Sequence, residues 1–492
     1  LLSFNGEIYN YGALHKKYFK QAKAAKSDTQ VLTQLIDLIG LSVMTELRGM
    51  FGILLVDTLE NKVHIIRDQF GQKQLYYHLE KGSFRVASEI KALLPKREFG
   101  LNLQAVYEYM ARGIYDDGKN TFVDGIFSVE PGEIVSVDLD SLSVRSEKFW
   151  DIDKIEVGTP KDSNYCVEEL GSLLSGVVHG ALHGDFSHAI SLSGGLDGAA
   201  LLALSKKTDI LSKIDRAYTV SFGDFSEVPE ASIIARYFGL PHEVIEYTPE
   251  DFYTQLSESI ASQEGPVGGL MNCGLQALAK RVSRAGYKTL IGGMGVDEIF
   301  GGYTSLNPKY FLARPNGSVL IDGSKGALGN SVFSADGLAR VKVIGEHQSE
   351  CATPRDMQLD ILKTSKLPRN LRMLDRLSMK SSLEMRSPFL DVDILDFALK
   401  IPVNEYYEGD LGKIPVRRLI SNDVPEFLMQ TPKTSVQTPQ RQWLMSKKFT
   451  LLFEKILSDR EFFEKYGLNL ERFKDMHIEA KLDQSAKFPL WQ

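Results

Sequence analysis

Short apolar runs separated by polar turns dominate the first 150 positions of the chain. Runs that are rich in Val, Ile, Phe and Tyr and are bounded by Gly, Asn or Pro are typical of strands. Their hairpin-like spacing predicts packed antiparallel sheets, and we expect an α+β domain over residues 1–150. The expected strands cover residues 1–4, 50–56, 62–66, 74–77, 84–87 and 133–137.

The pattern changes after a polar stretch, residues 151–164, which has the composition of a linker. Apolar residues then recur at helical spacing over 167–182. Alternating strands and helices follow, which predicts an α/β domain over 165–492 with a parallel sheet and ligands beyond the carboxyl ends of its strands. The stretch 303–349 is either a lid or a surface insertion. The expected strands are 189–192, 217–222 and 289–291, with helices at 199–204 and 231–238.

Composition narrows the class of protein. The chain has 492 residues, 43% apolar and 25% charged, which suits two globular domains. Its net charge of −7 argues against a general nucleic-acid-binding protein, and no apolar run is long enough to span a membrane. The three cysteines, Cys166, Cys273 and Cys351, form no CxxC pair, as expected of free thiols in a reducing compartment. We therefore expect a cytoplasmic protein that binds neither nucleic acid nor membrane.

Two glycine-rich segments directly follow expected strands. Ser193-Gly194-Gly195-Leu196-Asp197 comes after residues 189–192 and leads into a helix. The N–H groups of such a turn, together with the helix N-terminus, can bind phosphate oxygens. The segment 292–303 repeats this arrangement and contains Asp297. Neither segment is a Walker A loop or a dinucleotide fingerprint. We expect Asp197 and Asp297 to share one Mg²⁺ that bridges the phosphates of a nucleotide, with release of pyrophosphate.

A third segment, residues 375–391, is dense in charged side chains. Alternating charges on a helix usually face solvent. Because Leu377, Met379, Leu383 and Phe389 interleave with these charges, we expect some of them to be buried and paired.

These three segments resemble the signatures of the asparagine synthetase family, whose members join a glutaminase domain to an ATP-pyrophosphatase-type synthetase domain. The likeness spans nearly the whole chain in the expected order. It implies an antiparallel β-sandwich of the Ntn, class II amidotransferase type, followed by an ATP-pyrophosphatase domain with a parallel sheet and added helices. The first domain resembles class II glutamine amidotransferases at residues 5–10, 27–29, 48–52, 67–71 and 87–91.

The resemblance implies a glutamine site in the first domain. Asn5 and Gly6 would form the oxyanion hole, and Glu7 and Asp28 would hold the amino-acid end of glutamine. The family's nucleophile is a cysteine at the mature N-terminus, whereas the earliest cysteine of this chain is Cys166. Either a segment with the first strands of this domain precedes residue 1 and carries that cysteine, or the chain does not hydrolyse glutamine.

The resemblance also implies a synthetase site. Asp197 and Asp297 would bind Mg²⁺, Glu384 would act at the acceptor site as an orienting group or base, and Lys433 would stabilise negative charge in the second half-reaction. Lys413 and Arg417 resemble further phosphate or structural cations, although we expect a lysine on a helix to face solvent. The implied ATP site comprises Leu192, Ser193, Gly194, Gly195, Asp197, Val220, Gly292 and Gly293.

Two positions depart from the family pattern. Gly198 stands where a serine normally follows the aspartate, so a hydroxyl donor to phosphate is missing, at a cost of about 1.5–3 kcal/mol. Met294 stands where asparagine synthetases carry an acid and β-lactam synthetases a tyrosine. Methionine does no acid–base work, so we expect an acceptor larger or less polar than aspartate.

Taken together, the residues and the resemblance predict an enzyme that uses ATP and Mg²⁺ to adenylate a carboxylate, and that amidates it with ammonia from glutamine. A homodimer is compatible with this prediction. Two alternatives stay open: an amide-bond synthetase of the β-lactam synthetase kind that ignores glutamine, and a non-catalytic family member that binds a nucleotide.

Overall fold

The computed structural model describes most of the chain. Residues 159–164 of the expected linker, and residues 314–327 and 344–350 of the expected lid or insertion, lie outside the described residues. The described ranges are 1–20, 25–80, 82–94, 100–116, 118–158, 165–184, 186–313, 328–343, 351–433 and 438–482, the last with side chains to 479.

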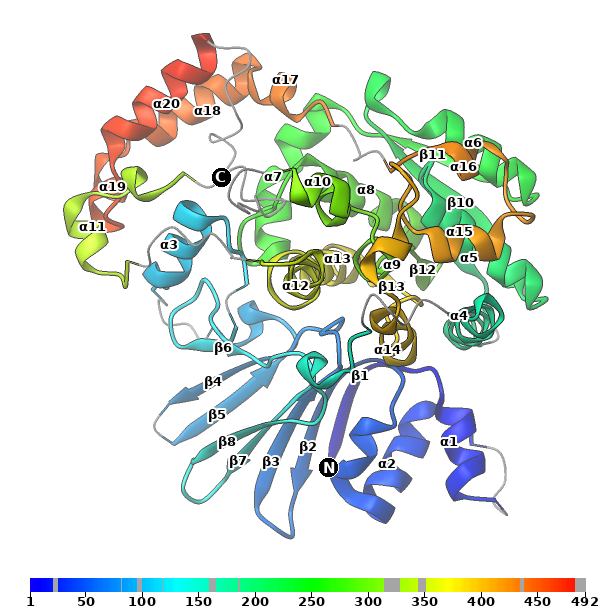
Figure 1. The fold of residues 1–492 in the computed structure, drawn as a ribbon. Coiled ribbons are helices and arrows are strands. Elements are labelled where there is room, and N and C mark those ends of the chain that lie inside the picture. The colour runs from blue at the N-terminus through cyan, green and yellow to red at the C-terminus, as the bar shows by residue number, and fades with distance from the viewer. Residues whose placement is uncertain are drawn as a thin grey trace.

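Two antiparallel sheets form the first part of the molecule, at the bottom of Figure 1. The larger sheet has the order β1-β2-β3-β7-β8, so β1 is an edge strand, and the smaller has the order β5-β4-β6. The strands are β1 (Leu2–Ile8), β2 (Gly49–Asp57), β3 (Lys62–Arg67), β4 (Tyr76–Glu80), β5 (Ser83–Ala87), β6 (Ile126–Ser128), β7 (Glu133–Asp138) and β8 (Val144–Lys148).

The hydrophobic side chains of both sheets share one cluster. Val63 and Val135 of the larger sheet pack in it with Tyr77 and Phe84 of the smaller. On the other face of the larger sheet, helices α1 (Tyr11–Tyr18) and α2 (Asp28–Ile39) bury a second cluster. The helices α1, α2 and α3 (Leu103–Arg112) make this part an α+β unit, as the sequence predicts.

A five-stranded parallel sheet organises the second part, with the order β11-β10-β9-β12-β13. Helices α4, α5 and α6 share the main core cluster, and α8 packs on residues of β9, β10 and β12 in another. The parallel arrangement confirms the prediction from alternating strands and helices. The elements are α4 (Val167–Ala181), β9 (His188–Ser191), α5 (Leu196–Lys207), β10 (Ile214–Ser221), α6 (Val228–Tyr237), β11 (His242–Glu246), α7 (Pro249–Gln263), α8 (Leu270–Arg284), β12 (Thr289–Ile291) and β13 (Glu384–Arg386).

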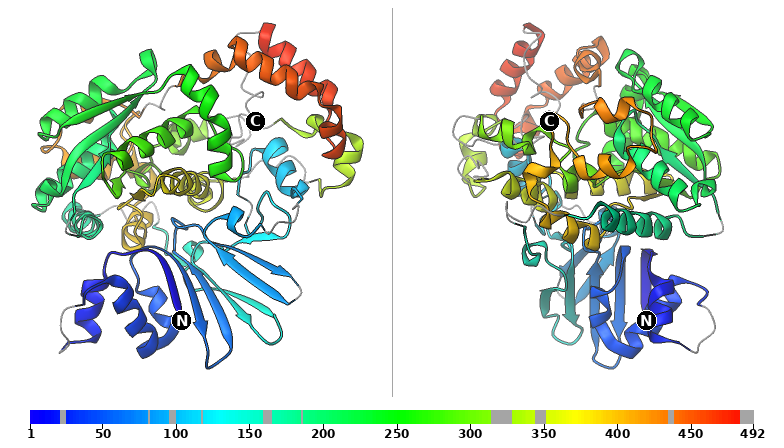
Figure 2. Two further views of the ribbon diagram at one scale, coloured as in Figure 1. Left: turned by 180° about the vertical axis from the view of Figure 1, so that it is seen from behind. Right: turned by 45° about the vertical axis from the view of Figure 1, so that its right-hand side comes forward.

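Further helices surround the sheet and extend from it (Figure 2). Phe333 and Met476 share a buried cluster with Tyr107 and Met110 of α3. Residues from the second half of the chain therefore pack on the first part of the molecule. None of the described helices is both long enough and apolar enough to cross a membrane. The further helices are α9 (Val296–Phe300), α10 (Pro308–Leu312), α11 (Ala335–Ala339), α12 (Pro354–Asp360), α13 (Leu367–Met379), α14 (Val392–Lys400), α15 (Ile414–Ile420), α16 (Phe427–Gln430), α17 (Gln440–Leu444), α18 (Lys447–Ser458), α19 (Arg460–Lys465) and α20 (Leu470–Leu482).

The charge-rich segment 375–391 is not one helix. Helix α13 ends at Met379, and residues Glu384–Arg386 form β13, one of the two edge strands of the parallel sheet. The expectation of buried charges is confirmed, because Asp375, Arg376 and Arg386 are all buried. The strand was not expected because it is three residues long and carries two charges.

Candidate functional site

Two glycine-rich turns meet at the carboxyl edge of the parallel sheet. Asp197 lies in the first turn of α5, after β9, and Asp297 lies in the first turn of α9, after β12. The turns touch: a Cβ atom placed on Gly293 would lie 2.6 Å from the Cβ of Asp197. Because real Cβ atoms do not approach so closely, only glycine fits at position 293, and its presence sets the spacing of the two aspartates.

One lysine bridges these two carboxylates. The Nζ of Lys413 lies 2.5 Å from Oδ1 of Asp197 and 2.6 Å from Oδ1 of Asp297. Lys433 adds a second cation, with Nζ 3.0 Å from Oδ2 of Asp297. The expectation that Lys413 faces solvent is wrong, since only 2% of it is exposed. Its backbone has a φ of +60°, which a non-glycine residue adopts at a cost, so the surrounding contacts hold this lysine in place.

The two aspartates differ in electrostatic environment. Burial alone would raise the pKa of Asp297, but its attraction to Lys413 and Lys433 is stronger and holds the pKa below its ordinary value. Burial raises the pKa of Asp197, and repulsion from Asp297 adds to this, while Lys413 opposes it. Asp297 is therefore the firmly ionised member of the pair.

The donor set fits a Mg²⁺ ion that is shared with phosphates. The two Oδ1 atoms flank one nitrogen and so lie within about 5 Å of each other, a spacing at which both can approach one hard cation. Among the described residues, no group of three or more His, Cys, Asp or Glu side chains is assembled around a metal position. Mg²⁺ in proteins is commonly bound by one or two carboxylates together with phosphate oxygens and water.

The expected ATP-site residues gather at the same edge. Ser193 is exposed, and its Oγ accepts a hydrogen bond from the N–H of Gly195 at 3.2 Å. A Cβ on Gly194 would lie 2.6 Å from the Cβ of Glu230, so this turn packs tightly on α6. Leu192 and Gly292 follow β9 and β12, and Val220 lies near the end of β10. A Cβ on Gly198 would lie 2.9 Å from Cδ1 of Leu192, the movable end of a side chain.

The expected glutamine-site residues lie on the edge strand β1 and at the start of α2. Asn5 donates from Nδ2 to Oγ of Ser88 at 3.1 Å. Gly6 has a φ of +151°, and a Cβ there would lie 2.0 Å from the carbonyl oxygen of Met50, so no side chain fits. Asp28 accepts from the N–H of Ile8 at 3.2 Å, which ties α2 to the strand that carries Glu7.

Glu384 lies between the two parts of the molecule. It begins β13, opposite Thr289 at the start of β12. Its Oε1 accepts a hydrogen bond from Nε of Arg386 at 2.8 Å, and its Oε2 lies 3.9 Å from Nζ of Lys73. Met294 is half-buried and packs against the main core cluster.

Sequence reasoning did not single out Arg386 or Lys73 as site residues. Both are buried, and both pair with carboxylates of the other part of the molecule: Arg386 with Glu7 at 2.8 Å, and Lys73 with Asp375 at 3.3 Å. The one indication in the sequence that such residues exist was the mixture of charged and apolar positions in segment 375–391, which predicted buried charges. The partners could not be assigned, because they are about 300 positions or more away in sequence.

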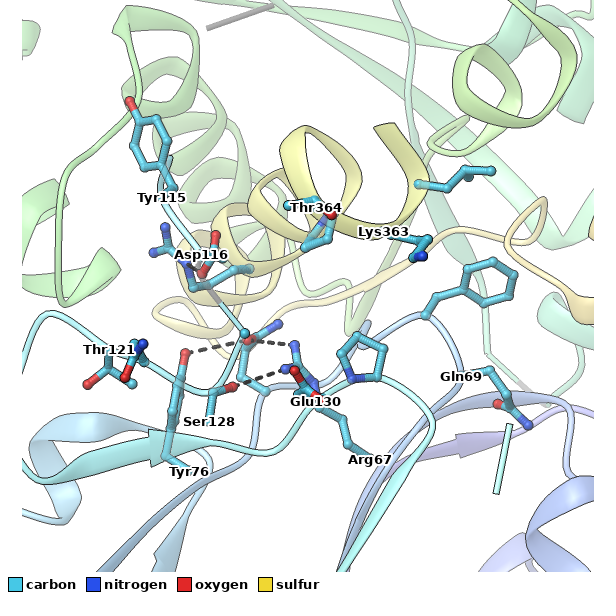
Figure 3. Close-up of a pocket in the computed structure, with 18 of the residues that line it drawn as sticks. Arg67, Gln69, Tyr76, Tyr115, Asp116, Thr121, Ser128, Glu130, Lys363 and Thr364 are labelled. Atoms are coloured by element: carbon cyan, nitrogen blue, oxygen red, sulfur yellow. Dashed lines mark hydrogen bonds and ion pairs between the residues drawn. The ribbon is translucent and has the colours of Figure 1, made fainter. Parts of the chain in front are cut away.

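A cavity of about 490 Å³ also lies between the two parts. Figure 3 shows Lys363 and Thr364 on one wall and Arg67 and Ser128 on another. Its walls include the ion pair of Arg372 Nε with Asp116 Oδ1 at 2.8 Å. None of the expected site residues is among the described residues that line this cavity.

Comparison with known proteins places these residues in a family. Residues 169–491 match asparagine synthase, and residues 1–150 match a glutamine amidotransferase domain. Asparagine synthetase (glutamine-hydrolysing) 1 of Bacillus subtilis is 25% identical over an alignment of 536 positions, gaps included, which covers 98% of this chain and 83% of the relative. A putative asparagine synthetase of Mycobacterium tuberculosis is 26% identical over 501 residues, covering 90% and 76%.

A third relative is similar over a shorter region. Putative asparagine synthetase (glutamine-hydrolysing) 2 of Methanocaldococcus jannaschii is 27% identical over 317 residues, which cover 62% of this chain and 60% of the relative. The match to asparagine synthase covers more than half of the chain. The chain therefore belongs to the asparagine synthase family, with a glutamine amidotransferase domain ahead of its synthase domain.

Proposed function

We propose that this protein is an ATP-dependent amidotransferase that adenylates a carboxylate, releases pyrophosphate and joins the activated acyl group to ammonia from glutamine. The observation that carries the proposal is the pair Asp197 and Asp297, which flanks one lysine nitrogen at 2.5 and 2.6 Å. The domains would span residues 1–150 and 165–492, and the first would be a β-sandwich of the class II amidotransferase type.

The proposed reaction requires both carboxylates and lysines, because a metal ion must be held and the negative charge of pyrophosphate must be neutralised. A carboxylate is a poor electrophile, and transfer of AMP gives its acyl group a stable leaving group. Mg²⁺ held by Asp197 and Asp297 would neutralise charge on the departing pyrophosphate. Lys413 and Lys433 lie within 3.0 Å of these aspartates, which supports a role for both in binding the phosphate oxygens of the same metal–nucleotide complex. The turn from Ser193 to Gly195 and the N-terminus of α5 would add N–H donors.

The glutamine half of the reaction is proposed for the edge of the first sheet. Asn5 and Gly6 would stabilise the oxyanion, while Glu7 and Asp28 would bind the ammonium group of glutamine. The described contacts support this arrangement, because Asp28 is tied to the strand that carries Glu7. None of these four residues is a nucleophile, so hydrolysis of glutamine also requires a thiol from outside this group.

Met294 bears on the acceptor. Its thioether packs against the core and offers neither an acid nor a base, so Glu384 is the candidate for acid–base work at the acceptor site. We propose a carboxylate larger or less polar than aspartate, with ATP and glutamine as the other substrates. We also propose a cytoplasmic protein with small-molecule partners rather than nucleic acid or membrane.

Product analysis with a panel of carboxylates tests the proposal. The protein is incubated with ATP, Mg²⁺ and each acid, and with either glutamine, ammonium chloride or no nitrogen donor. Release of AMP and pyrophosphate with an amide product that requires a nitrogen donor is the expected result. An amide or lactam formed without any donor would instead indicate a synthetase of the β-lactam type. ATP left intact with every acid would contradict the proposal and indicate a non-catalytic nucleotide-binding protein.

A further inference from the structure

The guanidinium group of Arg386 joins the two domains at a point where both candidate sites meet. Its Nη2 donates to Oε2 of Glu7 in the first domain at 2.8 Å, and its Nε donates to Oε1 of Glu384 in the second at 2.8 Å. Its Nη1 donates to the carbonyl oxygen of Ala181, at the end of α4, also at 2.8 Å. One side chain therefore holds a proposed glutamine ligand and the proposed acceptor-site residue together.

The surroundings fix this guanidinium in one position. Only 2% of Arg386 is exposed, and the aromatic rings of Tyr9 and Phe186 lie 5.8 Å from it. The hydroxyl of Tyr9 is also buried, whereas the carboxylates of Glu7 and Glu384 remain about one-quarter exposed. Because the guanidinium is buried, its attraction to the two carboxylates is screened less than it would be in water.

The carboxylates compete for the same cation. Glu7 and Glu384 repel each other, and burial raises the pKa of Glu7 while Arg386 opposes that rise. When one carboxylate is neutralised or occupied, the other keeps its attraction to Arg386 and no longer feels the opposing negative charge. An ammonium group bound at Glu7 would cancel its repulsion of Glu384, and a change at Glu384 would alter how firmly Glu7 is held against Arg386.

From this geometry we propose that Arg386 is a positioning residue that couples glutamine binding in the first domain to the state of the acceptor site in the second. The inference rests on the proposed function, because it assigns Glu7 to glutamine and Glu384 to the acceptor site. Coupling of this kind is reciprocal, so glutamine and the acceptor change each other's affinity by the same factor.

A double-mutant cycle with L-glutamine as the probe tests the proposal. Calorimetric titration measures the glutamine Kd of the wild type, Glu384→Gln, Arg386→Gln and the double variant. Glu384 lies in the other domain, yet Glu384→Gln should weaken glutamine binding by about fivefold or more. The reason is that Arg386 then holds Glu7 without the opposing charge of Glu384, so Glu7 is less available to the ammonium group of glutamine. In the Arg386→Gln background the same change should leave the Kd unaltered.

Two further variants make the result interpretable. Asp393→Asn removes another ion pair between the domains, that of Arg48 with Asp393 at 2.9 Å, and should leave the glutamine Kd unchanged. Arg386→Lys keeps the positive charge, but a lysine cannot donate to three acceptors in this geometry, so the variant should lose most of the coupling. If Arg386→Gln does not fold, Arg386→Lys takes its place in the cycle.

The outcomes separate the two proposals. The coupling is overturned if the wild type and Glu384→Gln have the same glutamine Kd. It is also overturned if Glu384→Gln changes the Kd equally with and without Arg386. Both outcomes leave the assignment of the glutamine site intact. Glutamine binding that survives Glu7→Gln and Asp28→Asn overturns the assignment of the glutamine site itself, and an absence of glutamine binding in the wild type overturns both.

Discussion

At the scale of single residues, the candidate synthetase site depends on a lysine whose ammonium group pairs with two aspartates. Lys413 is buried between Asp197 and Asp297, in a backbone conformation that a non-glycine residue adopts at a cost. The aspartates themselves were predictable, because each follows a glycine turn at the end of a strand. The lysine was not, because its burial results from tertiary packing more than 100 positions away in sequence, which no local pattern records.

Replacing Lys413 by methionine should expose the repulsion between the aspartates. Removing one partner of a buried ion pair costs about 3–5 kcal/mol, so the variant should unfold at a lower temperature without divalent cations. Because a metal ion can then take over the compensating charge, Mg²⁺ should raise its Tm more than that of the wild type. Thermal unfolding with and without MgCl₂ measures both effects.

The matched control for this prediction is Lys207→Met. Lys207 pairs with Asp423 at 2.8 Å, but both side chains are about one-third exposed. This variant should show a small loss of stability and the Mg²⁺ response of the wild type. A Lys413→Met protein with an unchanged Tm and no added response to Mg²⁺ would show that the lysine does not compensate the pair.

Gly293 should be equally sensitive to change. A methyl group there would overlap Asp197 and push the two turns apart, and misplacement of catalytic groups by about 1 Å can cost a hundredfold in rate. Gly293→Ala should therefore lose about two orders of magnitude in ATP–pyrophosphate exchange. Gly176→Ala, on an exposed helical site with nothing within 4 Å, should retain full exchange. Equal activity of the two variants would contradict the close packing of the turns.

At the scale of elements, the long and strongly periodic segments were predictable and the short ones were not. Strand β2 and helix α4 follow their apolar patterns closely, since β2 is a continuous apolar run that contributes to the clusters on both faces of its sheet, and α4 buries one face in the main core. Strand β13 has only three residues and is fixed by pairing with β12, so its alternation could not be distinguished from a charged helix face. The position of Glu384 and Arg386 on this strand was therefore beyond local reasoning.

Strand β9 carries a titratable group that should make stability depend on pH. Burial is the main cause that lowers the pKa of His188 from 6.5 to about 4, and the positive charge of Arg386 is the second. Because the folded state binds this proton more weakly than the unfolded chain, the contribution of His188 to stability is complete above pH 6.5 and is lost as the pH falls toward 4. The loss amounts to roughly 3 kcal/mol.

Urea unfolding at pH 7, 6, 5 and 4 measures this dependence. In His188→Gln the loss of unfolding free energy over that range should be smaller than in the wild type by roughly the same 3 kcal/mol. Parallel curves for the two proteins would show that His188 does not titrate as its burial requires.

At the scale of the whole molecule, buried ion pairs join the two domains. Lys73 from the first domain reaches Asp375 and Glu384 of the second, and Arg386 reaches back to Glu7. The N–H groups of Ile90 and Lys91 also donate to the carboxylate of Glu264 at 2.8 and 2.7 Å. The order of the two domains followed from the motifs in the sequence, but this interface did not, because its partners are between 173 and 379 positions apart.

Such an interface should make the domains unfold together. Lys73→Met leaves Asp375 and Glu384 without this cation and should cost about 3–5 kcal/mol in unfolding free energy. Urea unfolding followed by far-UV circular dichroism should show one transition for the wild type and an earlier one for the variant. Arg85→Met, which removes an exposed pair with Glu80 at 3.0 Å, should cost less than about 1 kcal/mol. Equal losses in both variants would contradict a structural role for the buried pairs.

The central claim is that Asp197 and Asp297 together bind the metal–nucleotide complex during adenylation of a carboxylate. The most direct measurement is ATP–pyrophosphate exchange in the presence of MgCl₂ and the panel of carboxylates, made with the wild type, Asp197→Asn, Asp297→Asn and, as a control, Asp423→Asn. We expect acid-dependent exchange in the wild type and in Asp423→Asn, and a loss of at least about a hundredfold in each site variant. Undiminished exchange in either site variant, or none with any acid in the wild type, would contradict the account.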